Sequence, residues 1–114
     1  MKDSDTTTLN RDQLRDITMD DQSLMREILG VLIDDTTRQM VLLQAAIQEE
    51  DITRCMRLAH YSKGACANVG ASSAAALLKD IESQAANRDF PQCQAALTQL
   101  AHEVDLLRTE AVSL

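Results

Sequence analysis

His60 and the residues that follow it have the types and the spacing that phosphoryl transfer needs. Lys63 and Gly64 come three and four residues after His60, and residues at these spacings are neighbours on one face of a helix. A neutral histidine offers a nucleophilic ring nitrogen at cellular pH without a separate base. Lys63 would place a positive charge beside a phosphoryl group on that nitrogen. We therefore expect His60 to accept the group and Lys63 to stabilise it.

Gly64 is costly in a helix, because an exposed interior glycine destabilises a helix by about 1 kcal/mol relative to alanine. Its place beside His60 indicates that a large partner must come close to the imidazole. The surrounding segment, residues 51–69, has three basic residues and one acidic residue, although the whole chain has a formal net charge of -7. A basic patch of this kind suits an anionic group and an acidic docking partner. The alternative is an ordinary histidine on a solvated helix face.

The composition favours a single helical domain as the scaffold for these residues. The chain has 114 residues, of which 45% are hydrophobic and only 2% aromatic, with three glycines and one proline. Sheets are enriched in β-branched and aromatic residues, and this length is that of one domain. We expect an all-α fold.

The negative net charge of the chain argues against two classes of binding partner. Proteins that wrap nucleic acid or lie on anionic membranes need a basic surface, so neither partner is expected. The sequence has no run of about 20 apolar residues that could span a bilayer, and its first residues, MKDSDTTT, are polar and unlike a signal peptide. These features favour a cytoplasmic protein.

Four long segments carry apolar residues at spacings of three and four, which is typical of amphipathic helices. The expected helices cover residues 22–50, 51–69, from Ser72 or Ser73 to at least 85, and from 89 to about 111. Short connections between them predict an up-down antiparallel four-helix bundle.

A short extra helix is expected to begin at Asn10 and to pack on the bundle through Leu9, Leu14 and Ile17. The resulting domain covers residues 10–114 and follows a polar lead over residues 1–9. Three features mark helix ends: caps at Asn10, Asp51 and Asp89, a terminating Gly70, and a cap at Ser72 or Ser73.

Other residues that could do chemistry are expected to be structural. Cys55, Cys66 and Cys93 fall on apolar stripes without metal-ligand spacing, so we expect buried, reduced thiols and no disulfide or metal site. His102 should lie at the surface, and Tyr61 should pack at the edge of the bundle. A phosphate-binding loop of the GxxxxGK[ST] type is absent from the sequence, so no ATP-dependent kinase activity is expected.

Residues 59–71, AHYSKGACANVGA, resemble the signature of histidine-containing phosphotransfer (HPt) domains. The family pattern H-x-x-K-G-x-x-x-x-x-G falls on His60, Lys63, Gly64 and Gly70. The resemblance extends over nearly the whole chain and implies a four-helix bundle. It also implies that His60 is the phosphoacceptor, that Lys63 holds the phosphoryl group, that Gly64 clears the approach and that Gly70 is structural.

The resemblance assigns roles to further positions. Glu82 matches a position in the following helix where a polar residue often contacts the active histidine. The candidate partner-binding residues are Arg57, Ala67, Asn68 and Glu82. Ser62 departs from the aliphatic residue that the family usually has at this position, which puts a hydroxyl group in the packed seam.

The resemblance also implies partners. The phosphoryl group would pass between His60 and an aspartate on a response-regulator receiver domain, in a relay that includes a hybrid sensor histidine kinase. The receiver would supply Mg²⁺ and most of the catalysis, so the carrier itself would need no cofactor and would act as a monomer. Two alternatives stay open: a non-catalytic module that binds a receiver or another signalling protein, or the phosphoacceptor domain of a larger sensor kinase.

Overall fold

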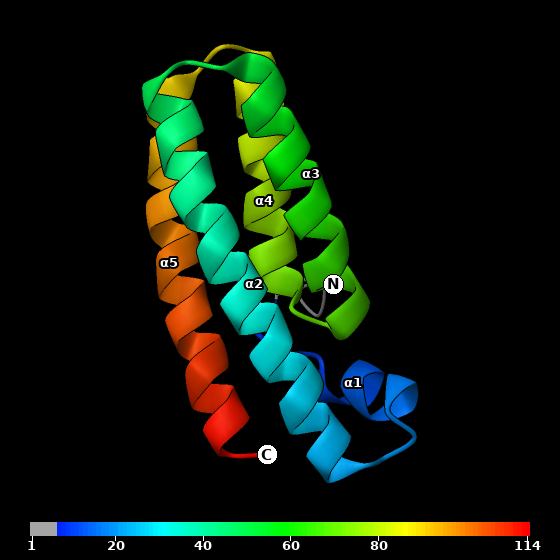
Figure 1. Ribbon diagram of the computed structural model, residues 1–114. Coiled ribbons are helices and arrows are strands. Elements are labelled where there is room, and N and C mark those ends of the chain that lie inside the picture. Colours follow the sequence, from blue (N-terminus) through cyan, green and yellow to red (C-terminus); the bar gives the residue numbers. More distant parts are fainter. Residues whose placement is uncertain (1–6) are drawn as a thin grey trace.

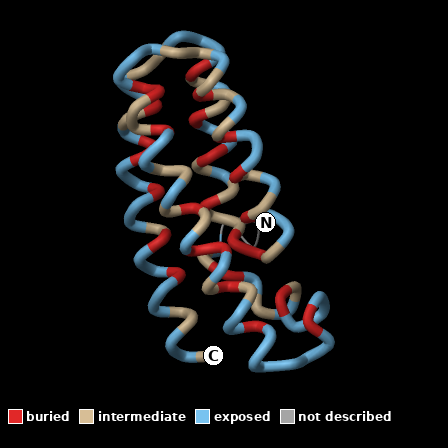
Figure 2. The backbone as a smooth tube through the Cα atoms, viewed as in Figure 1, coloured by how far each residue is buried: buried red, intermediate tan, exposed pale blue. Residues whose placement is uncertain are grey.

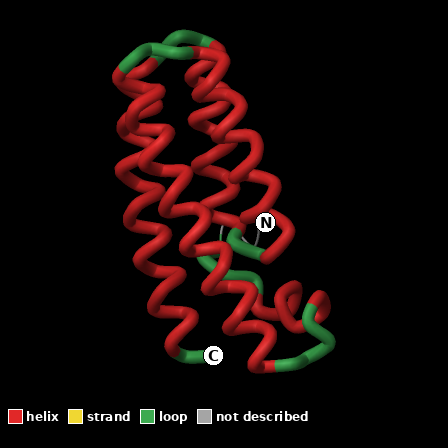
Figure 3. The backbone as a smooth tube through the Cα atoms, in the orientation of Figure 1, coloured by secondary structure: helices red, strands yellow, loops and turns green. Residues whose placement is uncertain are grey.

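The computed structural model describes residues 7–114, and all regular structure in this range is helical. The expected all-α fold is therefore confirmed. The first six residues of the expected polar lead lie outside the described residues. Figure 3 shows loops confined to the ends of the helices. The helices are α1 (Arg11–Ile17), α2 (Gln22–Gln48), α3 (Ile52–Val69), α4 (Ser72–Ala86) and α5 (Phe90–Val112).

The four long helices lie side by side and form a closed ring of contacts. Helix α2 packs against α3 and α5, and α4 packs against the same two helices. The α2–α3 and α4–α5 connections lie together at one end, the top of Figure 1, and α1 lies toward the opposite end beside α2. Among residues 7–114, no helix is long and apolar enough to cross a membrane.

The apolar stripes meet between the helices, where Figure 2 shows the buried residues. The inward face of α3 consists of small side chains, which let its neighbours approach closely: Cys55, Ala59, Ser62 and Cys66. All three cysteines are buried free thiols, as expected. Burial raises the pKa of Cys66 and of Cys93 to about 11, so both thiols are protonated at neutral pH.

Side-chain caps begin most of the helices. Asn10, Asp51 and Asp89 each accept a hydrogen bond from the backbone amide three residues ahead, at 3.1, 3.1 and 3.2 Å. These three predictions are confirmed. Asp21 caps α2 in the same way, at 3.1 Å from the Leu24 amide. Each cap satisfies an amide that the first helical turn leaves unpaired.

The prediction of a serine cap for α4 was wrong. Helix α4 begins at Ser72, its N-cap position is Ala71, and Ala71 has no side-chain cap bond. The segment before α1 takes over part of this task, because the Ser73 amide donates to the Thr7 carbonyl at 2.8 Å. A contact between residues 66 positions apart in the chain replaces the expected local cap.

Helix α1 and its flanking residues pack against the bundle. Leu9 and Leu14 are buried as expected, but Ile17 is 49% exposed, so its predicted packing was wrong. Helix α1 ends at Ile17, and Thr18 takes the inward position instead. The Thr18 hydroxyl donates to the Leu14 carbonyl at 2.8 Å, which allows a polar side chain to be buried there.

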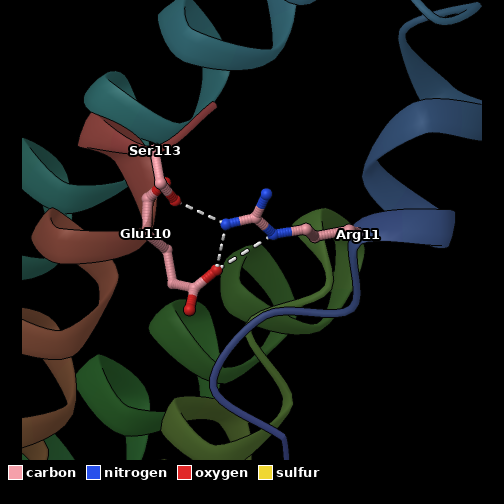
Figure 4. A network of polar contacts seen from close by, with 3 residues as sticks. All are labelled: Arg11, Glu110 and Ser113. Atoms are coloured by element: carbon pink, nitrogen blue, oxygen red, sulfur yellow. Dashed lines mark hydrogen bonds and ion pairs between the residues drawn. The ribbon is translucent and has the colours of Figure 1, made fainter.

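A polar network ties the start of α1 to the end of α5 (Figure 4). Arg11 Nη2 lies 2.6 Å from Glu110 Oε1 and 2.6 Å from Ser113 Oγ, and Arg11 Nε donates to the same glutamate oxygen at 3.0 Å. The planar guanidinium group thus links two side chains of α5. This network therefore fixes the start of α1 against the end of α5.

Candidate functional site

His60 lies on the outward face of α3, beside the buried Ala59 of the seam. Successive helical residues point about 100° apart, so burial of Ala59 and Ser62 turns the imidazole toward solvent. The His60 side chain is 68% exposed, whereas the Glu82 side chain on α4 is 23% exposed. The imidazole ring is therefore accessible, and the carboxylate beside it is half-buried.

Glu82 bridges His60 and Lys63. One carboxylate oxygen, Oε2, lies 3.0 Å from His60 Nδ1, and the other, Oε1, accepts a hydrogen bond from Lys63 Nζ at 2.9 Å. The sequence motif joins His60 to Lys63 along one helix, but the contact to Glu82 depends on how α3 and α4 are aligned. The structure brings the three residues together.

The charge of Glu82 determines which ring nitrogen of the neutral imidazole carries the proton. The hydrogen bond from Lys63 lowers the pKa of Glu82 most, partial burial acts against it, and the hydrogen bond from His60 lowers it further. Glu82 is thus ionised at neutral pH and can only accept hydrogen bonds. Nδ1 of His60 must be the donor, which places the lone pair of the neutral ring on Nε2.

Nε2 is the free nitrogen of this ring. It forms no hydrogen bond with any residue in the described range 7–114. A nitrogen with an available lone pair on an exposed ring can attack an electrophile that a partner presents. The arrangement suits transfer between proteins.

Gly64 leaves open space next to the ring. A Cβ atom built at Gly64 would meet no heavy atom of the described residues within 4 Å, apart from its own helix backbone and neighbours. Folding therefore does not require a glycine here. This agrees with the expectation that Gly64 serves the approach of a partner, a role that stays a prediction.

Gly70, by contrast, has a structural reason to be glycine. It ends α3 in the left-handed conformation, with φ of 96°, which other residues adopt at a cost. A Cβ atom at Gly70 would lie 2.9 Å from the Asn10 carbonyl oxygen. The Asn10 amide donates to the Gly70 carbonyl at 2.8 Å, so the chain before α1 is docked on this turn.

The other candidate residues surround His60 on α3. Arg57, Ala67 and Asn68 are all exposed. The Gln13 side chain donates to the backbone carbonyls of Ala67 and Asn68 at 2.7 and 3.2 Å, so α1 borders this surface. The side chains of Arg57, Ala67 and Asn68 remain accessible, and the role of these residues in partner binding stays a prediction.

Tyr61 lies at the edge of the bundle where α3 meets α2, as expected, but much of its side chain remains exposed. Its side chain is 56% exposed, and its hydroxyl donates to Asp35 Oδ2 on α2 at 3.1 Å. Tyr61 also lines an open groove of about 500 Å³ between α2 and α3, together with apolar residues such as Val31. Only the packing of α3 against α2 reveals this groove, because neither helix pattern indicates it.

Two further expectations concern groups away from the site. His102 is exposed on α5, as expected. Among the described residues, no group of three or more His, Cys, Asp or Glu side chains is arranged to hold a metal ion.

Two comparisons with known proteins found a similar family and a similar fold. The model of the Hpt domain family matches residues 27–110, a range that contains His60, Lys63, Gly64 and Glu82. A crystal structure of histidine-containing phosphotransfer protein B (HptB) from Pseudomonas aeruginosa PAO1 has the same fold, with a TM-score of 0.84 and 23% sequence identity over 93% of this chain and 92% of that chain. None of the curated protein sequences compared with this chain matches it. Because the family model matches most of the sequence, this chain belongs to the Hpt domain family.

Proposed function

We propose that this chain is a histidine phosphotransfer protein that relays a phosphoryl group between His60 and an aspartate on response-regulator receiver domains. Membership of the Hpt family supports phosphotransfer in a two-component phosphorelay. The observation that carries the assignment to His60 is its contact with Glu82, 3.0 Å from Nδ1, on a ring that is 68% exposed. This contact leaves Nε2 as the nucleophile.

The transfer step follows from this arrangement. The Nε2 lone pair attacks phosphorus of the aspartyl phosphate, the N–P bond forms, and the P–O bond to the aspartate breaks with its electron pair returning to the carboxylate. Nδ1 keeps its proton, so the phosphorylated ring is cationic and faces the Glu82 carboxylate. Lys63 stands three residues from His60 to offset the charge of the phosphoryl group. The reverse sequence returns the group to a receiver.

The receiver supplies Mg²⁺ and most of the catalysis, a hybrid sensor histidine kinase feeds the relay, and this chain acts as a monomeric cytoplasmic carrier without ATP-dependent kinase activity. Arg57, Ala67 and Asn68 contact the partner. The ring of contacts among α2, α3, α4 and α5 and their short connections support an up-down antiparallel four-helix bundle.

The test uses phosphorylated receiver domains and the two histidines of the chain. Wild type and His102→Gln should acquire acid-labile, alkali-stable phosphate, whereas His60→Gln should acquire none. His102 is the matched control because it is also an exposed helical histidine. Nitrogen-15 NMR of the labelled protein should place phosphorus on Nε2. Label on His60→Gln would refute the assignment, and binding without any label would favour a non-catalytic interaction module.

A further inference from the structure

Glu82 binds a different partner with each of its two carboxylate oxygens, so a group that attracts either partner would compete with the carboxylate. In the unphosphorylated chain, one oxygen is bonded to His60 and the other to Lys63. Lys63 is the residue that we assign to the phosphoryl group, which would add about -1.5 to -2 charges at neutral pH. If Lys63 turns to that group, one oxygen of a half-buried carboxylate loses its donor.

Lys79 is the cation placed to replace Lys63. It lies on α4 three residues before Glu82, so the two residues share a helix face, about one turn apart. Lys79 is exposed and forms no ion pair or hydrogen bond with any residue in the range 7–114. Its charge is therefore uncommitted in the unphosphorylated chain.

Lys63 and Lys79 also share a surface pocket. The two lysines line a shallow hollow of about 270 Å³ between α3 and α4, and its remaining lining residues are small: Ala67, Ser72, Ala75 and Ala76. Small side chains leave both ammonium groups free to change position. Arg57 does not line this hollow, although it lies one turn before His60.

We propose that Lys79 is a positioning residue of the phosphorylated carrier: as Lys63 turns to the phosphoryl group, Lys79 takes its place at Glu82. This inference rests on the proposed function of His60. With Lys79 in place, the Glu82 carboxylate stays ionised and oriented, and it keeps its hydrogen bond to Nδ1 of the cationic ring. Lys79 thus favours the phosphorylated state and contributes little to the unphosphorylated one.

The experiment measures the equilibrium of phosphoryl transfer between a receiver domain and the full chain. Lys79→Ala should shift this equilibrium away from the phosphorylated carrier by about two- to fivefold, the range of one partly exposed ion pair. Lys79→Arg should restore the wild-type value. Arg108→Ala, which removes the same charge from a surface of α5 away from the site, should leave it unchanged. The melting temperature of unphosphorylated Lys79→Ala should equal that of wild type.

A double-mutant cycle tests whether Lys79 acts through Glu82 or directly on the phosphoryl group. In a Glu82→Gln background, Lys79→Ala should have no further effect, because interacting residues are not additive. An equal effect in both backgrounds would show that Lys79 acts on the phosphoryl group directly and would overturn the proposal, as would a wild-type equilibrium in Lys79→Ala. A wild-type chain that takes no label would overturn the proposed function itself, so the two failures are distinguishable.

Discussion

Gly64 lies inside α3 and Gly70 caps the end of that helix, so the two glycines share one sequence motif but differ in their structural surroundings. Gly70 has a φ of 96°, and a side chain there would contact the Asn10 carbonyl at 2.9 Å. Gly64 is an interior helical residue with open space around it among the described residues. The fold requires a glycine at position 70, whereas at position 64 it only tolerates one.

This difference separates structural reasons from functional ones within one short motif. A glycine that destabilises an exposed helix without a steric reason needs another explanation. At Gly64 we propose that this explanation is the exposed ring of His60 one turn away. Substitutions at Gly70, Gly64, Ser62 and Glu82 should therefore affect stability and transfer to different extents.

Gly70→Ala should have the largest effect on stability. The left-handed conformation and the contact with Asn10 together should lower the free energy of unfolding by about 2 kcal/mol or more. Urea unfolding measures this change. Gly30→Ala is the control, because a Cβ there meets no described atom within 4 Å, and it should leave stability unchanged or raise it. Equal stability of Gly70→Ala and wild type would show that the fold does not require a glycine at position 70.

Gly64→Gln should impair transfer without loss of stability. A long side chain next to His60 should slow phosphoryl transfer at least about tenfold, whereas the better helix former should raise the free energy of unfolding by up to about 1 kcal/mol. Transfer kinetics and urea unfolding of the same sample separate the two effects. Gly30→Gln, on α2, should gain stability and keep the wild-type rate. A Gly64→Gln protein with normal transfer would show that the open space has no role in docking.

Ser62→Ala tests a position on the opposite face of α3. The Ser62 hydroxyl is buried, at 1% residue exposure, and has no hydrogen-bond partner among residues 7–114. Removing an unsatisfied buried hydroxyl should raise the free energy of unfolding by about 1 kcal/mol. Transfer should be unaffected, because Ser62 points into the bundle. A loss of stability in thermal unfolding would indicate that the hydroxyl has a partner after all.

Glu82→Gln should have the smallest effect: it should lower the free energy of unfolding slightly at neutral pH and hardly at all at acidic pH. Because the pKa of Glu82 is lowered in the folded chain, its carboxylate stabilises the fold at pH values above the ordinary pKa of 4.5. This contribution is lost as the pH falls from 4.5 through the lowered pKa. Wild type should therefore be the more stable protein at pH 7, and the difference should shrink toward pH 3. Lys63→Met should remove most of the same pH dependence, because the hydrogen bond from Lys63 is the largest cause of the shift. A difference independent of pH would contradict this account.

Much of this molecule could be predicted from local sequence patterns. The spacing of apolar residues gave the four long helices, and the caps at Asn10, Asp51 and Asp89 marked where helices begin. The exposure of His60 followed from its position relative to the buried stripe of its own helix. These features depend on residues within one or two helical turns, so the local sequence is enough to specify them.

Other features depend on contacts between distant parts of the chain. The bridge from Glu82 to His60 and Lys63 requires a particular alignment of α3 and α4, which core packing sets rather than the pattern of either helix. The Tyr61 hydrogen bond to Asp35 depends in the same way on α2 and α3. Local patterns therefore placed Tyr61 at the edge of the bundle but did not predict its partner on α2.

The sequence by itself determined that the chain is helical, where most helices begin, and which residue types surround His60. The family resemblance placed Glu82 near the ring. Only the tertiary structure decided that its two oxygens bridge His60 and Lys63, that the segment before α1 occupies the start of α4, and that Gly64 is free of steric constraint. The physical reason is that helical periodicity reports one face of one helix. The alignment of two helices is determined by how their side chains fill the space between them.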